Sequence, residues 1–431
     1  MIPLPLDEAE PLGRLVRGGW TDQATGIRID SRLVEEGDLF VAVGAGIDFR
    51  KHAFARGASA VLEPDDAFAA LAALGSAVRS RSRAQVVGIT GSTGKTSTKD
   101  ILAALCAPHA RTVAAAGGHN NELGLPLTLA SIEPDTEIVV AEMGMRGLGQ
   151  IAELCAVARP HIGVITGIGP VHLELLGSVE RVAEAKAEIV GALPAGGVAV
   201  APVQAPELDP FLRRDDVELR RFGPGGDASV VSFEPREREA EAVFDVRGRE
   251  LSLRVNFTAR HQADNAAAAL LAYDALGLPL DGAQEGADRI AFSRWRGEET
   301  PLPGEGLLIN DAYNANPVSM EASLRHLSDR AAGRRRVAVL GDMAELGQDA
   351  PAYHERVGRA AAANADVLVA VGELARGYLG AGVAQERHAA TVEDAVTAVD
   401  ELVRPGDVVL VKASRSAGLE RVAEALTAAK V

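Results

Sequence analysis

The sequence contains little cysteine and no long apolar run. Cysteine occurs only at Cys106 and Cys155 among 431 residues, which indicates a reducing compartment in which both remain buried thiols. No apolar stretch approaches the roughly 18 residues that a membrane-spanning helix requires, so a membrane span is excluded. The first ten residues, MIPLPLDEAE, lack the basic and apolar regions of a secretory signal. We therefore expect a cytoplasmic protein.

Positive charge is outnumbered throughout the chain. Lys and Arg number 44 against 60 Asp and Glu, a net charge of −16, which excludes nucleic acid as a partner because phosphate backbones attract clustered basic side chains. The one compact basic run, residues 334–336, precedes a strand, and we expect it to be a solvated loop. A chain of this length exceeds one ordinary core and predicts two or three domains.

Residues 88–96, GITGSTGKT, form the most informative segment. They follow an apolar pair and precede a helical pattern that continues to Cys106. In a strand, glycine-rich loop and helix start of this kind, backbone N–H groups point at phosphate while a lysine reaches the terminal phosphates. Gly91 and Gly94 would let the backbone approach, Lys95 would supply the charge, and the Thr96 hydroxyl can ligate Mg²⁺. A chance glycine turn is the alternative, which Gly-Lys-Thr in this setting disfavours.

Alternating apolar runs and helical patterns predict an α/β fold of three domains. Residues 1–83 form a small α/β unit, with strands expected at 38–43 and 60–62 and a helix at 52–56. Residues 84–293 carry the phosphate loop and a mostly parallel sheet, with an antiparallel edge hairpin at 242–257. Residues 294–431 form a doubly wound, Rossmann-like domain.

Polar residues near the expected strand ends suggest further chemistry. Asn120 and Asn121 either bind a carboxylate or phosphoryl group or cap the following helix, and residue type alone does not decide. Glu142 ends a strand near the loop that carries Thr96, where a metal ligand is expected. His172 lies beyond another strand end at the same sheet edge, which favours a functional over a structural role.

Lys186 carries no signal of its own. It lies in a helical pattern, RVAEAKAEIV, where a lysine is most often at the surface. A free ammonium beside Mg²⁺ would be repelled, so a role there requires an anionic, modified form.

Seven segments together identify a resemblance that covers nearly the whole chain. They are GITGSTGKT, HNNELGLPLTL, EMGMRGLGQI, GPVHLELLGS, EAKAEIV, ARHQADNAAAAL and NDAYNANPVSM. This combination resembles the Mur ligases of cytoplasmic peptidoglycan precursor synthesis. The NDAYNANP segment is the most type-specific, and an Asp-Asn-Pro-Arg motif, expected of the ligase that adds the third residue, is absent.

The resemblance implies an activity and its substrates. It implies an ATP-dependent amide ligase that adds D-alanyl-D-alanine to UDP-N-acetylmuramoyl tripeptide through an acyl phosphate. The first domain would bind the UDP substrate, the second ATP, and the third the incoming dipeptide. We expect a monomer. Two alternatives remain, a related ligase with another acceptor, such as a folate- or cyanophycin-type amide ligase, and a nucleotide-regulated binding protein that has lost ligation.

The resemblance also implies a metal centre. Thr96 and Glu142 would ligate a first Mg²⁺, and His172 a second one, complemented by Lys186 carried as a carbamate. Carbamylation turns that lysine into an anion. Lys95, His172 and Lys186 would then be the catalytic side chains.

The remaining implied contacts concern nucleotide and substrate. The expected ATP contacts are Gly91, Ser92, Thr93, Gly94, Lys95, Thr96, Ser97, Asn265, Arg296 and Asp311. The expected substrate contacts are Ser31, Arg32, Asn120, Asn121, Asn314, Ser414 and Arg415. Arg294 is an alternative to Arg296, since both lie in SRWRGEE, and the hinge for closure of the last domain is expected at 293–297. Three positions depart from the family pattern: Gln262, Ala413 and the DFRKH stretch at 48–52.

Overall fold

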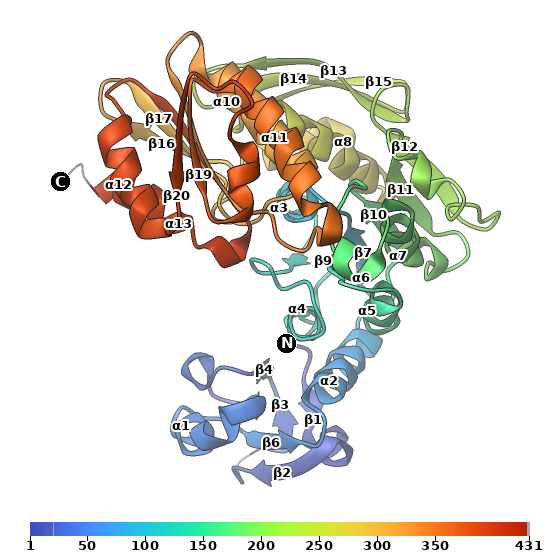
Figure 1. The fold of residues 1–431 in the computed structure, drawn as a ribbon. Helices are drawn as coiled ribbons and strands as arrows, with labels where there is room; N and C mark the ends of the chain where they lie inside the picture. The colour runs from blue at the N-terminus through green and yellow to red at the C-terminus, as the bar shows by residue number, and fades with distance from the viewer. Residues whose placement is uncertain (20, 429–431) are drawn as a thin grey trace.

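The computed structural model describes residues 1–19 and 21–428 and contains three α/β units in chain order (Figure 1). The first unit has a four-stranded sheet in the order β2-β6-β5-β4 and a small pair, β1 and β3. Its elements are β1 (Leu4–Pro5), β2 (Gly13–Arg17), β3 (Gln23–Ala24), β4 (Gly26–Arg28), β5 (Asp38–Val41), α1 (Arg50–Ala55), β6 (Ala60–Pro64) and α2 (Ala67–Arg81). The predicted helix and second strand are confirmed, and the first strand ends two residues earlier than predicted.

The second unit is built on a nine-stranded sheet in the order β15-β14-β13-β12-β11-β10-β7-β9-β8. The strands from β7 to β13 pair in parallel. At one edge of the sheet, β14 pairs antiparallel with both β13 and β15. The strands are β7 (Gln85–Thr90), β8 (Thr112–Ala114), β9 (Ile138–Glu142), β10 (Ile162–Ile165), β11 (Val198–Pro202), β12 (Glu218–Phe222), β13 (Ala228–Pro235), β14 (Ala240–Val246) and β15 (Arg249–Val255). The predicted parallel sheet and edge hairpin are confirmed.

Helices cover both faces of this sheet. They are α3 (Lys95–Cys106), α4 (Gly124–Leu129), α5 (Gln150–Ala158), α6 (Leu173–Leu176), α7 (Val179–Gly191), α8 (Arg260–Ala275) and α9 (Ala283–Ala287). Alanines of α8, such as Ala267 and Ala268, are fully buried against the sheet together with Leu102 of α3. Their small side chains let α8 approach the sheet closely, which places the start of α8 beside the phosphate loop.

The third unit has a six-stranded sheet in the order β16-β17-β21-β18-β19-β20, antiparallel only between β16 and β17. Its strands are β16 (Glu298–Leu302), β17 (Gly306–Asn310), β18 (Arg336–Gly341), β19 (Val367–Val371), β20 (Gln385–Ala389) and β21 (Val408–Lys412). Its helices are α10 (Pro317–Ala331), α11 (Ala350–Asn364), α12 (Val392–Leu402) and α13 (Glu420–Ala428). Separate apolar clusters on the two sheet faces give the predicted doubly wound core.

The first unit joins the second through α2, which lies between the N-terminal sheet and α5 (Figure 1). Leu71 and Leu74 of α2 belong to the same buried cluster as Ile151 of α5. Arg79 donates a hydrogen bond to the Ala158 carbonyl at 2.8 Å, and its guanidinium is buried. This helix, with its apolar face and polar end, thus helps to fix the N-terminal unit to the central unit.

The structure also tests the predictions for the two cysteines and for the basic run at 334–336. Both cysteines are buried free thiols, as predicted, and burial raises the pKa of each to about 12. The prediction of a solvated loop at 334–336 is wrong, because Arg336 opens β18 and pairs with Asp366 at 2.7 Å, while Arg335 pairs with Asp407 at 3.0 Å. In the part of the chain that the structure describes, no helix is long and apolar enough to cross a membrane.

Candidate active site

The phosphate loop links the end of β7 to the start of α3. Gly91 and Gly94 both adopt positive φ angles, 148° and 78°, which residues with side chains rarely take. A side chain at Gly91 would also collide with Thr166. The Lys95 ammonium donates a hydrogen bond to the Gly91 carbonyl at 2.7 Å. This bond holds the ammonium at the loop, and a bound phosphate would replace the carbonyl as its partner.

Asn265 lies directly against this loop. Its side-chain oxygen occupies the space that a Cβ at Gly94 would need, so glycine is required there by contact as well as by backbone angle. Asn265 donates to the Gln262 side-chain oxygen at 2.9 Å, one turn earlier in α8. Gln262, one of the three departures from the family pattern, therefore fixes the orientation of the predicted adenine contact.

The two adjacent asparagines have different partners. Asn120 donates to one carboxylate oxygen of Glu142 at 2.8 Å. Asn121 accepts from the Gly124 backbone N–H at 3.0 Å just before α4, whose N-cap residue is Leu123. Glu142 is fully buried at the end of β9, and its second oxygen has no partner among the described residues.

His172 and Lys186 both lie near Lys95, but the His172 side chain is partly exposed whereas Lys186 is buried. Burial lowers the pKa of His172, as do the charges of Lys186 and Lys95, whereas Glu345 raises it. Lys186, in α7, is 1% exposed. Burial, and then the charge of Lys95, hold the pKa of Lys186 well below its ordinary value. The sequence alone favours a surface position for this lysine, and the structure buries it.

The linker between the second and third units contacts the end of the phosphate loop, where α3 begins. Arg296 donates to the Thr96 hydroxyl at 2.9 Å and stacks on the Tyr313 ring at 3.9 Å. Arg294 is exposed and lies 5.2 Å from the Trp295 ring. Of the two arginines that the sequence could not separate, the structure therefore brings Arg296 to the phosphate loop.

Asp311, which follows β17, contributes a carboxylate to the site from the third unit. Burial would raise the pKa of its carboxyl, but Lys412 and Ser323 outweigh burial and lower it. Lys412 donates to Asp311 at 2.6 Å and to the Asn314 carbonyl at 2.9 Å. Sequence reasoning missed Lys412, although it ends a strand and opens the KASRS stretch. His261, also missed, faces the same region, and burial and His326 lower its pKa to about 4.

A cavity of about 540 Å³ gathers most of the predicted nucleotide residues. Its lining includes Ser92, Thr93, Gly94, Lys95, Thr96, Ser97, Asn120, Glu142, Asn265, Arg296, Asp311 and Asn314. Residues from the central sheet, the linker and the third unit thus share one space. The lining does not include Gly91, Asn121, His172 or Lys186.

The other predicted substrate residues lie apart from this cavity. In the first unit, Ser31 is buried and its hydroxyl lies 3.0 Å from His52 Nδ1, while Arg32 is exposed and pairs with Asp30 at 2.6 Å. In the third unit, Ser414 accepts from the Ala344 N–H at 2.9 Å. Arg415 lies 4.6 Å from the Trp295 ring.

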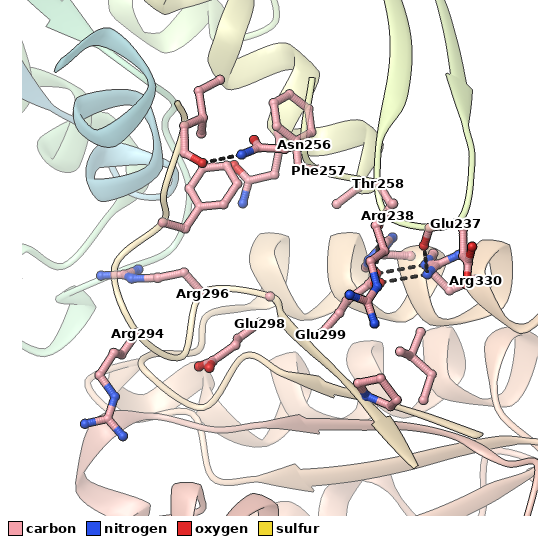
Figure 2. A pocket seen from close by; sticks show the side chains of 18 of the residues that line it. Glu237, Arg238, Asn256, Phe257, Thr258, Arg294, Arg296, Glu298, Glu299 and Arg330 are labelled. Carbon is pink, nitrogen blue, oxygen red and sulfur yellow. Dashed lines mark hydrogen bonds and ion pairs between the residues drawn. The ribbon is translucent and has the colours of Figure 1, made fainter. Parts of the chain in front are cut away.

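A second, larger cavity of about 910 Å³ lies beside the linker (Figure 2). Arg330 of α10 donates two hydrogen bonds to Glu299 of β16, at 2.8 and 2.7 Å, and a third to the Glu237 carbonyl in the β13–β14 turn at 2.8 Å. The Thr258 hydroxyl donates to the same Glu299 carboxylate at 2.7 Å. Glu299 therefore joins the second and third units beside the linker.

The residues around Glu142 fit a magnesium ion. The Glu142 carboxylate oxygen that no described residue contacts by a hydrogen bond and the 2%-exposed Thr96 hydroxyl are oxygen ligands of the kind that Mg²⁺ prefers. Within residues 1–19 and 21–428, no three His, Cys, Asp or Glu side chains gather into a metal site. The predicted set contains only two such side chains, Glu142 and His172.

Comparison with known proteins agrees with this geometry. The Mur ligase middle domain matches residues 89–273, and the Mur ligase glutamate ligase domain matches residues 296–415. The UDP-N-acetylmuramoyl-tripeptide–D-alanyl-D-alanine ligase of Mycobacterium tuberculosis is 36% identical to this chain, over 93% of this chain and 92% of the relative.

Two solved structures resemble the whole chain. MurF from Acinetobacter baumannii superposes with a TM-score of 0.87 at 27% identity and covers 99% of both chains. MurF from Thermotoga maritima in complex with ADP superposes with a TM-score of 0.82 at 29% identity, over 93% of this chain and 96% of that one. This chain therefore belongs to the Mur ligase family and, within it, to the MurF branch.

Proposed function

We propose that the chain is an ATP-dependent ligase that joins D-alanyl-D-alanine to UDP-N-acetylmuramoyl tripeptide, in cytoplasmic synthesis of peptidoglycan precursors. The observation that carries the proposal is the cavity shared by the phosphate loop, the Arg296 linker and Asp311 of the third unit. Such a cavity surrounds a nucleotide from two sides. The first unit, residues 1–83, would then bind the UDP substrate, residues 84–293 ATP, and residues 294–431 the dipeptide.

The nucleotide would enter with its phosphates on residues 91–97. Lys95 would exchange its bond to the Gly91 carbonyl for one to the terminal phosphates. Asn265, held by Gln262, would present its amide to the adenine edge. Arg296 and Asp311 would close over the nucleotide from the linker and the third unit.

Thr96, Glu142, His172 and Lys186 would hold two magnesium ions. When bound, these ions neutralise phosphate charge and polarise the oxygen atoms of the reacting groups. Lys186 requires a chemical change for this role, because an ammonium would repel them. Burial lowers the pKa of Lys186, which favours the uncharged amine. An uncharged amine that adds CO₂ and loses a proton becomes a carbamate anion.

The reaction requires activation of a carboxylate, which does not react with amines at neutral pH. Transfer of the γ-phosphoryl group of ATP gives an acyl phosphate that an amine can attack. Such a transfer depends on positioning and charge neutralisation, which Lys95 and Arg296 would supply. The same cations would stabilise the oxyanion formed when the amine attacks.

The attacking amine must lose a proton to a base. His354, in the third unit, is a candidate by residue type and location, but its contacts exclude it. This ring is fully buried, its Nε2 accepts from the Met343 N–H at 3.1 Å, and its Nδ1 lies 2.7 Å from the Ala350 carbonyl. Both nitrogens are therefore used within the third unit. Its stacking on Tyr378, with ring centroids 5.0 Å apart, is typical of a structural histidine.

The experiment that tests this proposal measures ADP release with each candidate substrate pair. Release that requires both UDP-N-acetylmuramoyl tripeptide and D-alanyl-D-alanine supports it. Release with a single amino acid, or with a folate-type acid instead of the tripeptide, would keep the ligase chemistry and refute the substrates. No release with any pair would indicate a nucleotide-binding protein without ligase activity.

A further inference from the structure

Two residues with left-handed backbones meet across the interface between the second and third units. His172, after β10, has a φ of 53°, and Glu345, after β18, has a φ of 63°. Residues other than glycine adopt such angles rarely, and they keep them where surrounding contacts outweigh the cost. The contacts between these two residues are such a case.

Side chain and backbone both contribute. His172 Nδ1 forms a hydrogen bond with a carboxylate oxygen of Glu345. The Leu173 backbone N–H donates to the Glu345 carbonyl at 2.9 Å. The other Glu345 oxygen lies 3.8 Å from Arg146 Nε, again in the second unit. One residue of the third unit is therefore held by three groups of the second.

The chemistry of the pair fixes the imidazole. An ionised carboxylate can only accept hydrogen bonds, so Nδ1 must carry the proton that it shares with Glu345. The lone pair of the neutral ring is then on Nε2, at the opposite edge of the imidazole. Carboxylates that bond one nitrogen of a histidine in this way orient the other nitrogen towards a metal.

We propose that Glu345 is a positioning residue, which the third unit brings to His172 so that Nε2 of this ring is set for magnesium only while that unit is docked. The inference rests on the proposed metal role of His172. It adds a residue that is not among the metal ligands implied by the family resemblance. It also gives docking of the third unit a direct effect on the metal site.

An ion pair that merely stabilises the interface would make no such link. The Glu345 side chain is 39% exposed and that of His172 25%, so an ordinary pair here would contribute little to stability. The two possibilities differ in the protonation site of His172 in the metal-free protein, which can be observed without any turnover.

The test uses the full chain labelled with ¹⁵N at its nine histidines. Long-range proton–nitrogen spectra are recorded without nucleotide or metal, and the His172 signals are assigned from their loss in His172→Gln. We expect a protonated Nδ1 and an unprotonated Nε2 in the wild type. Glu345→Ala and Glu345→Gly should both lose this pattern, and the glycine variant relieves the left-handed backbone, so backbone strain cannot explain its effect.

The second measurement is the Mg²⁺ concentration for half-maximal ADP release. Glu345→Ala should raise it roughly 10- to 100-fold, without a comparable rise in KM for the dipeptide. Glu345→Gln should keep the wild-type tautomer, because its amide oxygen can still accept from Nδ1. Its Mg²⁺ concentration for half-maximal ADP release should lie between those of the wild type and Glu345→Ala. Glu355→Ala, an exposed glutamate of α11, is the control and should change neither measurement.

Two results would overturn the inference. One is a wild-type His172 protonated on Nε2, or a tautomer that survives both Glu345→Ala and Glu345→Gly. The other is a variant whose tautomer changes while its Mg²⁺ requirement does not. Absence of turnover in the wild type with the proposed substrates would instead refute the proposed function, and the spectra would still report on the pair.

Discussion

Arg296 of the linker donates a hydrogen bond to the hydroxyl oxygen of Thr96, over 2.9 Å. A hydroxyl oxygen that ligates Mg²⁺ cannot keep a guanidinium beside it without strong repulsion between the two cations. Arg296 would therefore have to turn from Thr96 to the nucleotide when magnesium and ATP bind. Its Nε, buried without a partner among the described residues, is available for that second bond.

Replacement of Arg296 by alanine should weaken catalysis at the nucleotide. A hydrogen bond to a charged group contributes about 2 kcal/mol, so kcat/KM for ATP should fall roughly 10- to 100-fold. Arg296→Lys should recover little, because lysine neither stacks on Tyr313 nor donates as a planar fork. Arg294→Ala is the matched control, and an equal loss in that variant would contradict the assignment of Arg296.

Glu142→Gln should separate activity from stability. Its second oxygen is buried and has no partner within residues 1–19 and 21–428. Removing the charge should therefore leave Tm unchanged or raise it, whereas activity should fall roughly 100-fold or more. Thermal unfolding of the metal-free protein and initial rates check the two effects. Glu153→Gln, at an exposed position in α5, should alter neither. A large loss of Tm in Glu142→Gln would show that the carboxylate is structural.

Lys186→Ala should be inactive and open to chemical rescue. The variant leaves a space where we propose a carbamate, so acetate or formate should restore part of the rate. The same salts should give no gain in the wild type. Full activity of Lys186→Ala, or a loss that no short carboxylate restores, would refute the carbamate.

Stability should depend on Glu299 at neutral pH and lose that dependence in acid. Burial would raise the pKa of its carboxyl, but hydrogen bonds from His326, Arg330 and Thr258 lower it to about 2. Because the folded pKa lies below the ordinary value of 4.5, the stabilisation is complete above that value and disappears as the pH falls through 2. It amounts to roughly 3 kcal/mol at neutral pH.

Urea unfolding of wild type and Glu299→Gln at several pH values measures this dependence. The difference in free energy of unfolding should be largest at pH 7 and shrink below about pH 4.5. Glu298→Gln, at the exposed neighbouring position, should show no such trend. A Glu299→Gln difference that stays constant down to pH 2.5 would mean that the carboxyl is not held ionised by its partners.

The local sequence pattern predicted those strands whose own residues are apolar or alternate between apolar and polar. β7, β9 and β10 are apolar runs between parallel neighbours, and the alternation in β15 matched an edge strand. β12 was missed because its sequence, ELRRF, carries two arginines. Arg220 is buried and pairs both with Glu218 of the same strand, at 2.8 Å, and with the distant Asp274 of α8, at 2.9 Å. No pattern within five residues reveals such a partner.

The site divides in the same way. The phosphate loop was predictable because its glycines, lysine and threonine are contiguous and act through local backbone geometry. The bond between Arg296 and Thr96 joins residues 200 positions apart, and that between His172 and Glu345 spans 173. Only tertiary structure brings them together. The resemblance could therefore point to His172 and to Arg296, with Arg294 as its alternative, but the sequence could not identify their partners.

The most direct test of the account is the product of a reaction with ATP, UDP-N-acetylmuramoyl tripeptide and D-alanyl-D-alanine. Mass spectrometry of that mixture should show the UDP substrate heavier by one dipeptide residue, with one ADP and one phosphate released per product. Omission of D-alanyl-D-alanine should abolish the product. A tripeptide that stays unmodified, while ATP is consumed with another acid or amine, would contradict the central claim.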